Sequence, residues 1–133
     1  MDVTPARLCR VLIVDDDPGV LDVLREMIVT LDYDVMTAAS GALGLAALPI
    51  FEPDVVLLDL AMPGLTGVDV LSRVRRDHPH VPVVIVTANA APELTRDAVA
   101  QGAFDVIAKP FDMDNLGRIV GLAIQERGRR ASG

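Results

Sequence analysis

The sequence predicts an α/β protein in which a parallel sheet of five strands carries helices on both faces. Five short runs rich in Val, Ile and Leu alternate with longer amphipathic stretches, which is the pattern of repeated βαβ units. Turn residues separate the runs, and the chain contains no internal repeat or low-complexity linker. With 133 residues, 51% of them hydrophobic, the sequence suits a single domain with one ordinary core.

The strands are expected where the short apolar runs occur, at residues 10–14, 34–38, 55–58, 83–86 and 104–108. The first, third and fourth runs are almost entirely apolar, which is typical of strands buried on both faces at the centre of a parallel sheet. The second run, Asp34-Val-Met-Thr-Ala, alternates between polar and apolar residues and therefore favours an edge position.

The helices are expected at residues 18–31, 41–48, 68–77, 92–101 and 112–127. Asp17 followed by Pro18 predicts an N-cap with proline at the first helical position. Three further residues mark helix ends, two as N-caps and one as a left-handed C-terminal turn: Ser40, Asp112 and Gly102. Capping thus explains Asp17 but leaves Asp15 and Asp16 without a structural reason.

The composition excludes several classes of protein. A net charge of −7 opposes binding to nucleic acids or anionic membranes, and a basic cluster of Arg127, Arg129 and Arg130 is interpreted as a solvated helix end. Cys9 is the only cysteine, so an intrachain disulfide and a cysteine zinc site are both excluded. Because the sequence shows no signal peptide or long apolar segment, we expect a soluble, cytoplasmic protein.

The polar residues at the ends of four predicted strands are the strongest functional signal. Ligands of open parallel sheets bind outside the carboxyl ends of the strands, near the point where strand order reverses. The side chains expected to converge there are Asp15, Asp16, Asp59, Thr87 and Lys109. Each has an ordinary structural explanation when it is taken alone, but together they indicate one small site.

This set of residues predicts a magnesium-dependent phosphoryl acceptor. Mg²⁺ prefers a few carboxylates with waters and phosphate oxygens, so Asp16 would ligate it directly and Asp15 through water. Asp59 would be the nucleophile, and the Lys109 ammonium would cancel repulsion between this carboxylate and the incoming phosphoryl group. The Thr87 hydroxyl and the backbone N–H that follows it would donate to the phosphoryl oxygens.

Four motifs in order resemble the receiver domain of two-component response regulators. They are Val-Leu-Ile-Val-Asp-Asp-Asp-Pro (11–18), Leu-Leu-Asp-Leu-Ala-Met-Pro-Gly (57–64), Val-Thr-Ala (86–88) and Gly-Ala-Phe-Asp-Val-Ile-Ala-Lys-Pro-Phe (102–111). The match covers residues 8–126, nearly the whole chain, and the last motif with its Lys-Pro-Phe-Asp extension is similar to receivers of the nitrogen-regulation type.

The resemblance implies a flavodoxin-like (βα)5 fold with strand order 2-1-3-4-5, over a domain of residues 8–127 with a C-terminal tail at 128–133. It implies that a histidine kinase or phosphotransfer protein phosphorylates Asp59, and that the domain catalyses only its own phosphorylation and dephosphorylation. The implied Mg²⁺ ligands are Asp15, Asp16, Asp59 and the Ala61 carbonyl, and a cis peptide is implied before Pro110. A homodimer or an output partner would dock on the fourth helix, fifth strand and fifth helix.

One position departs from the family pattern. Three residues before the lysine, the family usually has a tyrosine or phenylalanine that turns inward when the threonine moves, whereas this chain has Val106. The conformational switch is therefore assigned to Thr87 and Val106. Phe104 is expected on the same face of the strand as Val106, where it would pack or replace the missing ring.

Three other functions fit the sequence less well. A haloacid-dehalogenase-type phosphatase needs an acid two residues after the nucleophile, where this chain has Ala61. A flavin carrier would bind phosphate in a polar, glycine-rich loop after the first strand, where three aspartates would repel it. A receiver-like scaffold that is never phosphorylated is disfavoured because every chemical residue is present.

Overall fold

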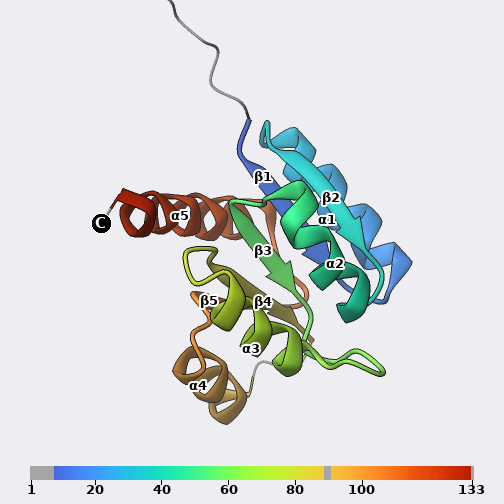
Figure 1. Ribbon diagram of the computed structural model, residues 1–133. Helices are drawn as coiled ribbons and strands as arrows, with labels where there is room; N and C mark the ends of the chain where they lie inside the picture. Colours follow the sequence, from blue (N-terminus) through green and yellow to red (C-terminus); the bar gives the residue numbers. More distant parts are fainter. Residues whose placement is uncertain (1–7, 89–90, 133) are drawn as a thin grey trace, which may run out of the picture.

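The computed structural model describes residues 8–88 and 91–132, and over these residues it contains the expected five strands and five helices in alternation (Figure 1). The strands are β1 (Arg10–Val14), β2 (Asp34–Ala38), β3 (Val55–Leu58), β4 (Val83–Thr87) and β5 (Asp105–Ala108). The helices are α1 (Pro18–Thr30), α2 (Gly41–Phe51), α3 (Gly67–Asp77), α4 (Pro92–Ala100) and α5 (Met113–Ser132).

The sheet is parallel throughout, and its strand order β2-β1-β3-β4-β5 confirms the predicted topology. β3 and β4 are buried along their whole length and β1 along all but its first residue, as their apolar sequences predict. β2 lies at one edge and is partly exposed. All five strands run in the same direction, so their carboxyl ends meet at one edge of the sheet.

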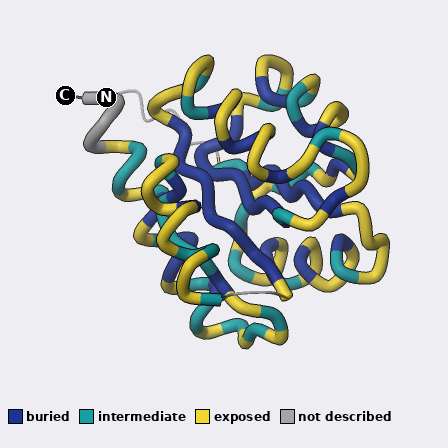
Figure 2. Tube along the Cα trace, turned by 90° about the horizontal axis from the view of Figure 1, so that it is seen from below, coloured by how far each residue is buried: buried dark blue, intermediate teal, exposed yellow. Residues whose placement is uncertain are grey.

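Two separate cores form because alternate residues of each strand face opposite sides of the sheet. Leu12 and Val14 pack with buried side chains of α2, α3 and α4, whereas Val11 and Ile13 pack with those of α1 and α5. Figure 2 shows the buried strands running through the middle of the molecule, with exposed turns of the helices around them. The sheet is thus covered on both faces, which is what near-continuous apolar strands require.

The predicted helix caps are confirmed. The Asp17 carboxylate accepts from the amides of Gly19 and Val20 at 2.9 and 3.4 Å. Ser40 caps α2 by accepting from Leu43 N at 3.1 Å, and Asp112 accepts from Asn115 N at 2.7 Å. Gly102 has φ +103°, the left-handed conformation expected after α4. The cis peptide between Lys109 and Pro110 is present as well.

Two helices extend further than expected. α2 continues through Pro49 to Phe51, because this proline lies in the last turn, is exposed, and removes only one intrahelical hydrogen bond. The last turn is closed by Glu52 N, which donates to Leu48 O at 3.0 Å. α5 continues to Ser132, so the residues assigned to a tail are helical up to that point. The domain boundary at residue 127 stays a prediction.

Arg127 is not the solvated helix end that its basic cluster suggested. Its Nε lies 3.2 Å from Oδ1 of Asp54, a carboxylate that is buried at the start of β3. The other oxygen of Asp54 accepts from Arg10 N at 2.7 Å. This pairing joins α5 to the amino-terminal edge of the sheet. No local sequence pattern indicates it, because the two residues are far apart in the sequence. The side chains of Arg129 and Arg130 lie outside the described residues.

Gly67 sets the distance between α3 and the end of β3. Its amide donates to Leu60 O at 3.2 Å, and an added Cβ would overlap the backbone of Asp59 and Leu60. Gly67→Ala should therefore destabilise the protein by about 1–3 kcal/mol, the usual range for overpacking a close contact. Chemical denaturation of parent and variant measures this change.

The matched control is Gly121→Ala on α5, where an added Cβ meets no heavy atom within 4 Å. This variant should gain about 0.4–1 kcal/mol, because alanine restricts the unfolded chain more than glycine does. Equal effects of the two substitutions on the free energy of unfolding would contradict this explanation.

Candidate functional site

Three carboxylates meet at the carboxyl edge of the sheet, as the sequence predicts. Asp15 and Asp16 follow β1, and Asp59 follows the adjacent strand β3, whose backbone is tied to β1 by Asp59 N donating to Val14 O at 3.0 Å. One oxygen from each carboxylate lies within 4.8 Å of the others. Asp15 and Asp59 are buried, whereas Asp16 is exposed. Three hard oxygen donors at this spacing match the ligands that Mg²⁺ prefers.

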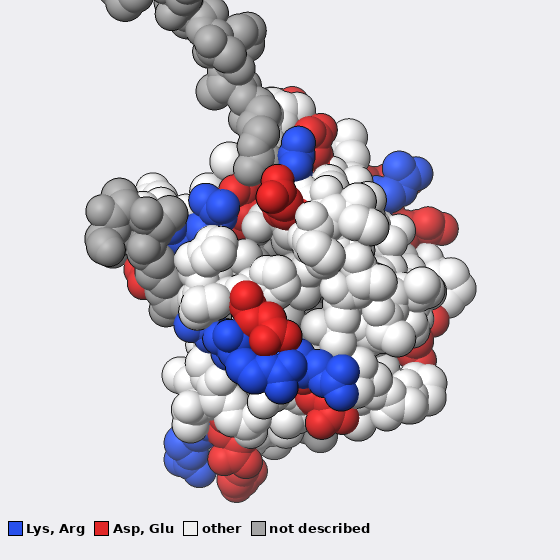
Figure 3. Space-filling model, in the orientation of Figure 1, with Lys and Arg blue, Asp and Glu red and all other residues white. Residues whose placement is uncertain are grey.

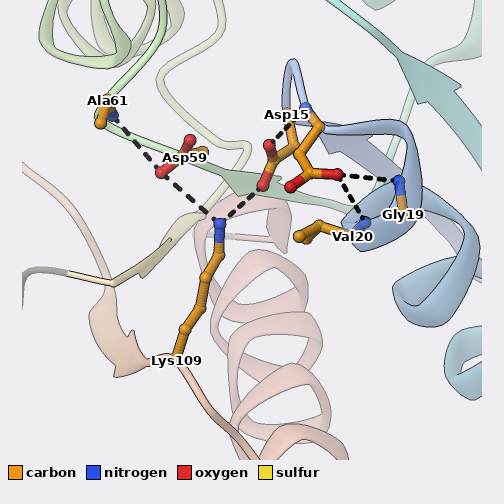
Figure 4. A network of polar contacts seen from close by, with 7 residues as sticks. Asp15, Gly19, Val20, Asp59, Ala61 and Lys109 are labelled. Atoms are coloured by element: carbon orange, nitrogen blue, oxygen red, sulfur yellow. Dashed lines mark hydrogen bonds and ion pairs between the residues drawn. The ribbon is translucent and has the colours of Figure 1, made fainter.

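Lys109 brings a positive charge to these acids from the end of β5, an edge strand of the sheet (Figure 4). Its Nζ lies 2.9 Å from Oδ2 of Asp15 and 3.8 Å from Oδ1 of Asp59. Sequence reasoning placed the ammonium opposite the nucleophile and did not predict that it bonds most closely to Asp15. No pattern in the sequence signals this pairing, because 94 positions separate the two residues.

The three consecutive aspartates have three different environments. Both oxygens of Asp15 are engaged, one by Lys109 and the other by Asp17 N, which donates to Oδ1 at 3.0 Å. Asp17 instead caps α1, where its Oδ1 accepts from the amides of Gly19 and Val20. Asp16 and Asp17 are both exposed, but only Asp16 belongs to the acid cluster. Within that cluster, Asp16 therefore has the carboxylate most accessible to a metal ion from solvent.

The Asp59 carboxyl is electrostatically unfavourable as an anion. Burial, and then the neighbouring Asp15, raise the pKa of Asp59 above its usual value, and Asp16 adds to this effect. The Lys109 ammonium and the Ala61 amide, which donates to Oδ1 at 3.4 Å, oppose the rise without cancelling it. A bound cation would favour the ionised form that a nucleophile needs.

Thr87 and Lys109 lie side by side at the ends of β4 and β5. Lys109 N donates to Thr87 O at 2.8 Å, and the Thr87 side chain is buried. The structure thus brings Thr87 to the same edge of the sheet as the three acids and the ammonium. The next residue, Ala88, is exposed, whereas Asn89 and Ala90 lie outside the described residues.

Val106 and Phe104 do not share a face, and the expectation that they do is wrong. Val106 packs against the core beneath α2, α3 and α4, whereas Phe104 packs against the core beneath α1 and α5. The reason is that β5 begins only at Asp105, so strand alternation does not extend back to Phe104. Phe104 therefore cannot replace the aromatic ring that is missing at position 106.

The family model for the response regulator receiver domain matches residues 11–120 of this chain. This chain belongs to the response regulator receiver family. The receiver domain is 39% identical over 114 residues to the DNA-binding transcriptional regulator NtrC of Escherichia coli strain K12, a match that covers 86% of this chain and 24% of NtrC. It therefore spans about a quarter of the length of that relative.

Solved receiver domains have the same fold. The receiver from Methanospirillum hungatei JF-1 has a TM-score of 0.86 at 28% identity, covering 92% of this chain and 98% of that one. A CheX-CheY complex with BeF3 and Mg²⁺ from Borrelia burgdorferi has a TM-score of 0.81 at 27% identity, covering 84% of this chain and 86% of the matched one. Among the described residues of this receiver, no helix is long and apolar enough to cross a membrane.

The raised pKa of Asp59 predicts how stability depends on pH. The folded protein holds the proton of Asp59 more tightly than the unfolded chain does. The contribution of Asp59 to the free energy of unfolding is therefore fully present below the unfolded pKa and is lost as pH rises through the folded pKa. Asp59→Asn should therefore raise the melting temperature of the metal-free receiver at pH 7 by several degrees. The gain should vanish near pH 3.

Melting curves between pH 3 and pH 8 in EDTA measure this effect. Asp97→Asn, which removes a charge from an exposed position on α4, is the control and should show little pH-dependent change. If Asp59→Asn melts below the parent at pH 7, the ion pair with Lys109 outweighs burial and repulsion, and the electrostatic account fails.

Proposed function

We propose that this receiver accepts a phosphoryl group on the Asp59 carboxylate. The observation that supports the proposal is the position of this buried carboxylate between two further acids and the Lys109 ammonium, 3.8 Å away. A carboxylate oxygen attacks phosphorus and forms the O–P bond, while the N–P bond of a phosphohistidine donor breaks. The electron pair of that bond returns to the imidazole nitrogen, which then takes up a proton.

The proposed metal ligands are the carboxylates of Asp15, Asp16 and Asp59 with the carbonyl of Ala61. The clustering of the three acids within 4.8 Å supports Mg²⁺ as the cation, since hard oxygen donors suit it and this set leaves positions for water and phosphoryl oxygens. When bound, Mg²⁺ would neutralise charge between Asp59 and the phosphoryl oxygens. The Ala61 amide already contacts Asp59, which supports placing this loop in the site.

Lys109 and Thr87 are proposed to bind the phosphoryl oxygens. On phosphorylation the ammonium would move from Asp15 toward the phosphoryl group, a short shift because Asp59 is already 3.8 Å away. The Thr87 hydroxyl would donate from the neighbouring strand end. Because Lys109 N donates a hydrogen bond to Thr87 O, movement at either residue would be transmitted to β4 and β5 together.

The proposed donor is a histidine kinase or a phosphotransfer protein, and the proposed output acts through α4, β5 and α5. The relatedness to NtrC supports a regulatory role in which this domain controls a partner or a further domain. Beyond its own phosphorylation and dephosphorylation, we assign the domain no enzymatic activity. The cytoplasmic location stays a prediction of the sequence.

Mass spectrometry tests the central proposal. Incubation with acetyl phosphate and Mg²⁺ should add one phosphoryl group to the parent and none to Asp59→Asn. Asp97→Asn on α4 should be phosphorylated to the same extent as the parent. Modification of Asp59→Asn to the parent's extent would disprove the assignment of the acceptor.

A pair of neighbouring substitutions tests the metal site. Asp16→Ala should weaken Mg²⁺ binding at least tenfold and slow phosphorylation, while the metal-free fold becomes more stable because like-charge repulsion is relieved. Asp17→Ala should keep Mg²⁺ affinity but lose about 1 kcal/mol of stability with its N-cap. Calorimetric Mg²⁺ titration and melting in EDTA separate the two effects, and the reverse pattern would exclude Asp16 as a ligand.

The valine at position 106 predicts where the conformational change is largest. Val106 is partly buried and too short to alternate between a buried and an exposed rotamer, so we expect only modest repacking around it. The change should instead concentrate in α4 and in the preceding segment from Asn89 to Glu93, of which the first two residues lie outside the described residues. Hydrogen exchange with and without beryllofluoride measures it. A change confined to residues 104–108 would contradict this expectation.

A further inference from the structure

The outward face of α2 has a composition that solvent alone does not explain. The helix, Gly-Ala-Leu-Gly-Leu-Ala-Ala-Leu-Pro-Ile-Phe, contains no charged or hydrogen-bonding side chain along its eleven residues. By contrast α3, on the same side of the sheet, exposes Asp69, Arg73 and Arg76 as an ordinary surface helix does. Helices that are apolar on every side are normally buried on every side.

α2 carries large apolar residues on its outward face, in addition to the buried Leu48 and the two glycines of its inward face. Gly41 and Gly44 face the interior, and a Cβ at Gly44 would lie 2.7 Å from a methyl group of Val14, so only glycine permits this close approach to the sheet. The larger Leu43 and Ile50 face outward and are 58% and 79% exposed. Ala42, Ala46 and Pro49 are the other exposed residues of the helix.

An apolar groove continues this face onto the edge of the sheet. It has a volume of about 480 Å³ and lies between α2 and β2, with Leu21 of α1 at its other side. β2 pairs only with β1 among the described strands, so its outer edge is open beside the groove. Figure 3 shows the surface over α2 free of charged side chains, which gather instead around it and over α3.

We infer that this face, α2 with the groove along β2, is a weak homodimer interface. The exposed Leu43 and Ile50 also line the groove, so a twofold axis through this face would place apolar side chains of one copy against the same apolar side chains of the other. An isologous contact repeats each apolar contact twice and leaves no charged group buried, because α2 contributes none.

The size of the face sets the strength of the contact. An eleven-residue helix is about 16 Å long, and with the adjacent strand edge it forms a strip about 20 Å wide. Such a strip matches the apolar centre of an interface and falls short of the roughly 800 Å² per partner of a standard-sized one. We therefore expect a weak, reversible dimer.

This interface differs from the surface proposed for output. α2 packs over β1 and β2, whereas α4 lies at the opposite edge of the sheet beside β5 (Figure 1). It also includes neither Asp59 nor Lys109. Failure of phosphoryl transfer would therefore leave the inference standing, and the converse holds as well.

Sedimentation equilibrium of the 133-residue chain, from about 10 μM to 1 mM, tests the inference. The parent should change from monomer to dimer over this range, and Ile50→Glu should weaken association at least tenfold. Val29→Glu is the matched control, since it adds the same charge at a 50% exposed position on α1 outside the groove. It should dimerise nearly as the parent does.

Amide chemical shifts recorded over the same concentrations locate the contact. The amide shifts of residues 36–39 and of residues 41–51 except Pro49 should change with concentration in the parent and stay constant in Ile50→Glu, while circular dichroism confirms that the variant is folded. A parent that stays monomeric at 1 mM would overturn the inference and leave this face for a different protein. A dimer that persists in Ile50→Glu, or shifts confined to α4, β5 and α5, would overturn it as well.

Discussion

Two carboxylates are buried next to each other at the ends of adjacent strands, and the rest of the site compensates for that burial. Asp15 and Asp59 are 1% and 6% exposed, so neither is well hydrated when ionised. Among the residues that the structure describes, the only ammonium in direct contact with them is that of Lys109, which follows β5, a strand separated from β1 by β3 and β4. A single electrostatic requirement thus connects strands that share no backbone hydrogen bonds.

The compensation is incomplete in the metal-free protein, and this has a functional meaning. The pKa of Asp59 stays raised although Lys109 and the Ala61 amide both lower it. A divalent cation would satisfy the remaining negative charge, and a phosphoryl group would in turn attract the ammonium that now contacts Asp15. In the proposed mechanism, the same unbalanced charge would favour metal binding first and rearrangement of Lys109 afterwards.

Most of the fold and the position of the site follow from local sequence patterns. The nearly continuous apolar runs of β1, β3 and β4 identify the centre of the sheet, and the polar residues after the strands identify its functional edge. What local patterns missed depends on contacts between distant residues. The pairing of Lys109 with Asp15, like that of Arg127 with Asp54, arises only when the strands and α5 are assembled.

The alternation of residues along a strand did not predict the position of Phe104 correctly, and the reason is local. Strand periodicity places Phe104 on the face of Val106, but β5 starts at Asp105, so this periodicity does not extend to Phe104. The expected helix ended at residue 48, whereas α2 continues to Phe51, because a proline in an exposed last turn costs a single hydrogen bond. In both cases the error lies in the boundary of an element and not in its type.

The ionic contacts at the two ends of β3 have a mechanical consequence. Asp54 at its start is held by Arg10 N and Arg127, and Asp59 at its end is held near Lys109, with four wholly buried residues between them. A strand that is fixed at both ends and packed on both faces resists displacement in the centre of the molecule. β5 and α4 are less buried than β3, so we expect displacements that begin at the carboxyl edge to be larger in β5 and α4 than in β3.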